Sequence, residues 1–235
     1  MQTIPVLNLS LVLIPALMVV GILWRWSAEP GAALYALARM VIQLVLIGFV
    51  LTYLFAAEHA VMVAGILSVM LLVSAWIALR SVPEQRTRLY FKALLATGLV
   101  NLVLLILITQ AVLTSEPWFQ PNQVIPLAGM IFAVGMNAIS LFAERFFAEL
   151  KNNAALLTAR NTAYRATLIP TLNSLLAVGL VSLPGMMTGQ ILSGVSPLIA
   201  VRYQIMIMLV LFSSSGLTAF VFYYLARPSI ADKPN

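Results

Sequence analysis

Long apolar runs separated by short polar segments are the main pattern along the chain. A helix needs about 20 apolar residues to cross the hydrocarbon core of a bilayer. Runs that approach or exceed this length predict seven transmembrane helices, at about residues 6–24, 33–55, 60–79, 93–113, 125–142, 168–183 and 198–225. No repeat and no linker divides them. We therefore expect an all-α, polytopic integral membrane protein in which residues 1–235 form a single transmembrane domain.

The sixth run is short because a segment rich in Gly, Pro and Ser, GLVSLPGMMTGQILSG at residues 179–194, interrupts it. Inside a bilayer, irregular backbone is tolerated only where protein or a water-filled cavity satisfies its N–H and C=O groups. The pattern predicts a broken or re-entrant segment at residues 184–197 that lines a substrate pathway or forms a gate. Its pathway candidates are Pro184, Gly185, Met186, Met187, Thr188, Gly189 and Gln190.

The same segment has a simpler interpretation. Gly185 and Gly189 have the G-x-x-x-G spacing that lets another backbone approach closely, which is typical of a tight turn or of a contact between two copies. The polar side chains of Thr188, Gln190 and Ser193 either offer oxygens to a permeating solute or only satisfy unpaired backbone groups. Both alternatives remain open at this stage.

Composition places the chain in a membrane. Hydrophobic residues make up 62% of the sequence, charged residues 9%, and the mean hydropathy is +1.03. A globule of 235 residues cannot bury so much apolar surface. The net charge of +6 forms no basic, aromatic-interleaved face, so we expect no nucleic-acid partner. There is no cysteine, which excludes disulfides and thiolate ligands.

The basic residues predict the topology. Eleven of the thirteen Lys and Arg residues fall on one side of the seven predicted helices, and the loops around Glu58 and Glu116 on the other side contain none. By the positive-inside rule the basic side is cytoplasmic. We therefore expect the N-terminus outside, the C-terminus inside, and a multi-pass protein of a cell membrane of the bacterial inner-membrane type.

The other two arginines, Arg39 and Arg202, lie within predicted helices, where an ionisable side chain costs about 2.5–3.5 kcal/mol at the bilayer centre. Arg39 has Gln43 one turn later on the same face. Each arginine either lines the pathway or reaches toward headgroups or carbonyls. The remaining polar candidates for the pathway are Gln204, Asn137, Asn173 and Ser174.

The longest segment between predicted helices, residues 144–167, has apolar residues at helical spacing and charged residues on another face. We expect a cytoplasmic amphipathic helix there. It either lies on the inner leaflet or docks a cytoplasmic partner. The residues that would carry such docking are Arg145, Glu149, Lys151 and Arg160.

Several strings resemble a known family of permeases. They are VSLPGMMTGQILSG at residues 181–194, RYQI at 202–205, QVIPLAGM at 123–130, MNAIS at 136–140 and LIPTLN at 168–173. Together they resemble the FetB-type permeases, membrane subunits of an ABC-type metal exporter that are related to plant aluminium-sensitivity permeases. The resemblance implies a separate cytoplasmic ATPase and two copies of the permease. The chain has no G-x-x-x-x-G-K-[ST] loop, so ATP would be used by the partner and no cofactor is expected here.

The chain departs from that family in one segment. Relatives usually have a longer cytoplasmic segment before the sixth helix, suited to a coupling helix that fits a groove in the ATPase. Here no glycine occurs between Gly135 and Gly179, and the segment is shorter. Either residues 144–165 dock in a modified way, or coupling to the ATPase is lost or rerouted.

Candidate metal ligands are scarce. His59 is the only histidine, and no Asp or Glu lies deep in a predicted helix, so we expect no dedicated metal site. The thioethers of Met186, Met187, Met206 and Met208 suit soft Cu(I) better than iron or aluminium. A metal would pass hydrated or chelated.

These observations leave three functions open. The first is outward movement of a metal or its complex, the second is export of an anionic solute such as a nucleotide sugar, and the third is an uncoupled scaffold or passive carrier. Enzyme motifs such as H-E-x-x-H and G-x-S-x-G are absent from the sequence. We therefore expect a transport subunit and not an enzyme.

Overall fold

The computed structural model describes residues 5–26, 30–54, 59–114, 116–117 and 119–231. The chain forms two compact units, Met1–Ala57 (unit 1) and Glu58–Asn235 (unit 2). Unit 1 contains α1 (Val6–Leu11), α2 (Leu13–Trp26) and α3 (Pro30–Leu54). Unit 2 contains α4 (Ala60–Ala78), η1 (Pro83–Gln85), α5 (Arg86–Ile106), η2 (Leu107–Val112), α6 (Pro121–Lys151), α7 (Leu156–Ala177), α8 (Gly185–Leu192) and α9 (Pro197–Ala231). Within the described ranges there is no β-strand, which confirms the all-α prediction.

Six helices are long and apolar enough to cross a membrane, so the predicted count of seven is not confirmed. They cover Asn8–Trp26, Pro30–Phe49, Ala60–Ala78, Pro83–Val112, Pro121–Lys151 and Pro197–Pro228. The predicted helix at residues 168–183 is the missing one. Its first ten residues belong to α7, which begins twelve residues earlier, at Leu156, and ends at Ala177, whereas residues 178–183 lie in the turn that follows. Because Arg160, Asn161 and Arg165 lie in this added first half, the helix as a whole is less apolar than the others.

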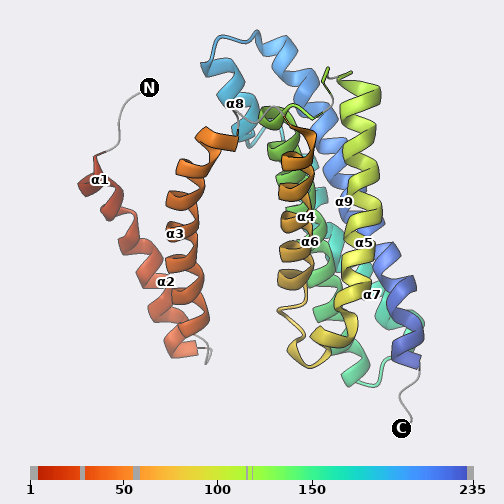
Figure 1. Ribbon diagram of the computed structural model, residues 1–235. Helices are drawn as coiled ribbons and strands as arrows, with labels where there is room; N and C mark the ends of the chain where they lie inside the picture. The colour runs from red at the N-terminus through yellow and green to blue at the C-terminus, as the bar shows by residue number, and fades with distance from the viewer. Residues whose placement is uncertain (1–4, 27–29, 55–58, 115, 118, 232–235) are drawn as a thin grey trace. The chain divides into compact units, whose positions relative to one another are not determined.

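Unit 2 is a bundle whose successive long helices run in opposite directions (Figure 1). Helix α6 is central, since it packs against α4, α5, α7 and α9. The α4–α5 turn, the α6–α7 turn and the end of α9 lie at one end of the unit, whereas α8 lies at the other (Figure 1). The basic turns of unit 2, which the charge pattern assigns to one side of the membrane, therefore share one end.

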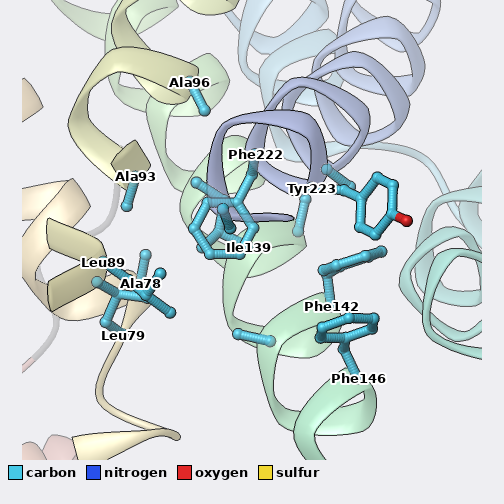
Figure 2. Close-up of a cluster of buried hydrophobic side chains, with 14 of the residues drawn as sticks. Ala78, Leu79, Leu89, Ala93, Ala96, Ile139, Phe142, Phe146, Phe222 and Tyr223 are labelled. Atoms are coloured by element: carbon cyan, nitrogen blue, oxygen red, sulfur yellow. The ribbon is translucent and has the colours of Figure 1, made fainter. Parts of the chain in front are cut away.

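Two buried clusters hold unit 2 together. The one nearer the basic end has an aromatic centre in which Phe142 lies 5.5 Å from Phe146 and 6.0 Å from Tyr223, measured between ring centroids (Figure 2). Alanines such as Ala78 and Ala93 surround it and let the helix backbones approach closely. The second cluster, nearer α8, is formed by α4, α5, α6 and α9 around Ile108 and Ile131.

The single amphipathic helix expected at residues 144–167 is not formed. Helix α6 continues to Lys151, a turn of four residues follows at 152–155, and α7 then begins. Asn153 takes the left-handed conformation (φ 60°) that glycine usually adopts here, and the N–H groups of Asn153 and Ala154 donate to the carbonyls of Leu150 and Glu149. The apolar residues Phe147 and Leu150 pack on the aromatic cluster, so the protein itself covers the face that would have met lipid or a partner.

Candidate functional site

The chain between α7 and α8 folds back as a compact turn. After Ala177 the backbone becomes extended at Val178, and Gly179 adopts φ 84°, a conformation that L side chains rarely take. The Val181 N–H donates to the Ala177 carbonyl at 2.8 Å, and the Gly179 N–H donates to Ser182 at 3.0 Å. These bonds satisfy backbone groups that the end of α7 would otherwise leave unpaired.

Helix α8 is short because both of its ends are closed by specific residues. Pro184 precedes its first residue in an extended conformation and cannot donate a backbone hydrogen bond. At the other end Gly194 has φ 95°, its N–H donates to Ile191, and the Val195 N–H donates to Gln190. This is the Schellman arrangement that ends helices at glycine. Helix α9 then begins at Pro197, a favoured first position.

The hydroxyl groups of this region satisfy nearby carbonyls. Thr188 Oγ1 donates to Pro184 at 3.1 Å, Ser193 Oγ to Gln190 at 2.9 Å, and Ser174 Oγ to Pro170 at 3.0 Å. Their protons are therefore used locally, which favours the simpler of the two interpretations of these hydroxyls. Their lone pairs can still accept hydrogen bonds.

Two neighbouring hollows lie where α7, the turn after it, α8 and α9 meet. The first, which we call the apolar hollow, has a volume of about 320 Å³. Its lining includes Leu175, Val178, Met187, Gln204, Met208 and Leu209. The second, the polar-edged hollow, has a volume of about 410 Å³ and shares Val178 and Met208 with the first. Its other lining residues include Asn173, Ser174, Ser182 and Pro184.

The most unusual side chain in this region is Gln204. It is only 6% exposed, it lines the apolar hollow, and its Oε1 atom has no hydrogen-bond partner within the described residues. Oε1 of Gln190 on α8 is buried and unpartnered in the same sense. An unpaired buried amide oxygen is unfavourable by about 1–3 kcal/mol. Such groups call for an explanation, and a bound molecule is one.

The four methionines separate into two pairs. Met187 and Met208 line the apolar hollow, whereas Met186 and Met206 pack against the second buried cluster. Across the described residues no three His, Cys, Asp or Glu side chains come together. The hollow therefore offers thioethers and an amide, which is a poor ligand set for a hard cation.

The glycines of α8 are not used for close packing within the described chain. A Cβ placed on Gly185 or Gly189 would meet nothing within 4 Å. The close approach expected from their spacing is not formed inside this unit, so the surface around them is open.

The other predicted pathway residues are absent from the linings of the two hollows. Arg202 is exposed at the start of α9, and Asn137 is exposed on α6 away from the lining of either hollow. Arg39 is half-buried and Gln43 exposed on α3 of unit 1. The structure thus brings together Asn173, Ser174, Pro184, Met187 and Gln204, and their role in a pathway stays a prediction.

The predicted docking residues lie at the opposite end of unit 2 from α8. Arg145 and Glu149 form an ion pair of 2.6 Å one turn apart on α6, and Lys151 is exposed at the end of that helix. The Arg160 guanidinium donates to Asn161 Oδ1 at 2.8 Å and lies 5.8 Å from the ring centroid of Tyr223.

A buried polar cluster escaped the sequence analysis. Asn101 on α5 is fully buried, and its Oδ1 accepts hydrogen bonds from Ser214 at 2.7 Å and Thr218 at 3.3 Å on α9. The Asn101 amide fits only because Gly135 on α6 has no side chain. The sequence feature that could have revealed this cluster is Asn101 itself, a single amide in the middle of an apolar run, because polar residues are rare inside membrane helices.

The fold and these sites define a multi-pass α-helical membrane protein. The chain belongs to the family described as "Uncharacterised protein family (UPF0014)", which matches residues 6–230. It is 32% identical over 237 residues to the "Probable iron export permease protein FetB" of Escherichia coli, covering 93% of this chain and 90% of that protein.

Two further relatives come from Synechocystis sp. and Arabidopsis thaliana. The chain is 32% identical to a UPF0014 membrane protein of Synechocystis sp., covering 83% of this chain and 81% of the relative. It is 29% identical to the protein ALUMINUM SENSITIVE 3 of Arabidopsis thaliana, with 86% and 78% covered. The resemblance to FetB-type permeases is thereby confirmed. No solved structure matches the chain.

Proposed function

We propose that this chain is the membrane-spanning permease subunit of an ABC-type exporter, moving a metal or its complex outward with a separate ATPase and as two copies. The match to a probable iron export permease over nearly the whole of both chains supports the class of function. The observation that carries the proposal is the junction of α7, α8 and α9. There, irregular backbone and an unpartnered buried amide border two hollows in a membrane protein.

The pathway runs along this junction. Irregular backbone in a membrane protein is stable only beside other protein or water, and residues 178–184 and 193–196 separate three helices at one end of unit 2. The lining is mostly apolar with few polar groups, as in ligand sites generally. Such a lining disfavours a bare cation and favours a metal wrapped in an organic ligand.

The ATPase would act at the basic end of unit 2. Lys151 and Arg145 are exposed there, and the half-buried Glu149 pairs with Arg145 next to the turn that links α6 and α7. Exposed charges of this kind determine which partner binds and how fast it associates more than they determine the affinity. We expect the ATPase to contact this turn and the neighbouring α4–α5 turn.

The test is co-purification of the tagged full-length chain with ABC ATPases of its own cell, followed by ATP hydrolysis in liposomes. Lys151→Gln should weaken the complex, whereas Arg202→Gln removes one exposed positive charge at the other end and should leave it intact. Stimulation of hydrolysis by metal chelates would support export of a complex. If the unmodified chain and both variants are stably folded and none of them captures an ATPase, the proposal is refuted.

One observation favours a second function. The turn of four residues between α6 and α7 leaves no room for a separate coupling helix. An uncoupled carrier or scaffold would need none. Downhill movement of a solute in liposomes without any ATPase would identify the carrier. A folded chain that moves no solute and captures no ATPase would identify the scaffold.

A further inference from the structure

The two hollows have a lining that selects against charge. Among the described residues that line them, none is ionisable, and Arg202 is absent from both linings although Val201 beside it borders the apolar hollow. A charged group placed there would lose its hydration without gaining a counter-charge. The lining therefore favours an uncharged occupant.

The lining also requires a polar group on the occupant. Gln204 is 6% exposed and its Oε1 has no partner in the part of the chain that the structure describes. The terminal torsion of glutamine is broad, so the amide can present either its oxygen or its nitrogen to the hollow. A hydroxyl group, which both donates and accepts, can bond whichever of the two amide atoms faces the hollow.

The rest of the occupant is apolar and small. Met187, Met208 and Leu209 form the wall of the apolar hollow, and its volume of about 320 Å³ lies at the lower end of the range for small-molecule sites. Methionine side chains adapt their shape to irregular apolar groups. Where the two hollows meet, at Val178 and Met208, the lining changes to Asn173 and Ser174. A second polar part of the same molecule fits there.

Other occupants fit less well. A plain acyl chain would leave the Gln204 amide unpaired, and a hard cation would find thioethers and amides where it requires carboxylates. The flat surface of a second protein copy cannot reach a side chain that is 6% exposed. Only a molecule that enters the hollow can.

We infer that the α7–α8–α9 junction binds an uncharged amphiphile, with its apolar body against Met187 and Met208 and a hydroxyl on the Gln204 amide. This goes beyond the proposed function, since binding needs neither ATP nor a partner. The same chemistry has two sources, a neutral hydroxylated lipid from the bilayer or a small hydroxylated solute from water.

The experiment is photolabelling of the full-length chain in nanodiscs with an octanol that carries a diazirine. Peptide mass spectrometry should place the adducts on Met187, Met208 or Leu209. An octanoic acid with the same diazirine, charged at neutral pH, should label these positions several-fold less. Unlabelled monoolein in the bilayer and unlabelled hexanol in the buffer then compete separately, and the one that halves the labelling identifies the source.

Variants make the test specific. Gln204→Leu should lower labelling about fivefold, as expected for one hydrogen bond. Met208→Trp should lower it further, because Met208 lines both hollows and the larger ring narrows them. Gln110→Leu, an exposed glutamine in η2, is the matched control and should label normally. Gel filtration checks that each variant folds.

Three results would overturn the inference: equal labelling by the charged probe, unchanged labelling of Gln204→Leu, or competition by neither compound. The outcome is separate from that for the proposed function. If the chain is labelled but captures no ATPase, only the exporter proposal is refuted. If it captures an ATPase but is not labelled, only the inference of an amphiphile site is refuted.

Discussion

Gly135 makes room for the buried amide of Asn101, and replacing it with alanine tests the packing of unit 2. A Cβ at this position would press on the Asn101 Nδ2 atom and lie 3.3 Å from Thr218 Oγ1. Neither atom can withdraw easily, because Asn101 and Thr218 are fully buried and their hydrogen bond joins α5 to α9. Gly135→Ala therefore forces three helices apart or breaks the polar cluster.

The magnitude follows from opposing terms. Overpacking a tight core costs about 1–3 kcal/mol, and losing the two hydrogen bonds to Asn101 Oδ1 costs about 1 kcal/mol each. Alanine gains about 1 kcal/mol over glycine within a helix. The net expectation is a loss of about 2–4 kcal/mol in the free energy of unfolding.

The assay is reversible unfolding of the purified chain in mixed micelles, followed by circular dichroism. Gly129→Ala on the same helix is the matched control, since its Cβ would make only an ordinary contact of 3.5 Å with the flexible end of Met70. The double variant Gly135→Ala with Asn101→Ala should lose less than the sum of the single variants. Equal stability of Gly135→Ala and Gly129→Ala would refute this reasoning.

Three further predictions concern the turns and the pathway. Gly194→Ala should lower stability by about 1–2 kcal/mol because φ is 95° there, whereas Gly185→Ala, in open space, should be neutral in the same unfolding assay. Asn153→Val should destabilise by about 1–2 kcal/mol at φ 60°, and Asn153→Gly should not; equal melting of the two would contradict this. Arg39→Ala should abolish transport in liposomes while membrane insertion, measured by protease protection, stays normal; normal transport would remove Arg39 from the pathway.

Hydropathy was a good guide wherever a helix is apolar along its whole length. Six helices that the structure describes as long and apolar enough to span overlap six of the predicted runs. It placed the start of α7 twelve residues too late, because a helix can continue from an apolar half into a half with Arg160 and Arg165 when those arginines lie at the end of a bundle. Periodicity cannot distinguish that case from a separate surface helix, and it missed the turn at Asn153, where asparagine replaces the expected glycine.

The candidate site was only partly visible in the sequence. The Gly, Pro and Ser signals located the turn residues Gly179, Pro184 and Gly194, because these residue types have restricted or unusual backbone preferences. Which side chains face inward could not be deduced from composition. Met187 and Met186 are neighbours in sequence, yet only Met187 lines a hollow.

The continuity of α7 has a mechanical consequence. One helix starts at the basic end, where Leu156 follows the short turn, and finishes at Ala177 in the wall of the polar-edged hollow. A helix of this length transmits a displacement of one end to the other, and Pro170 inside it is the position where it can bend. A push of an ångström or two on the turn would thus tilt Asn173 and Ser174, so that a force applied at the basic end of unit 2 changes the shape of the polar-edged hollow at the other end.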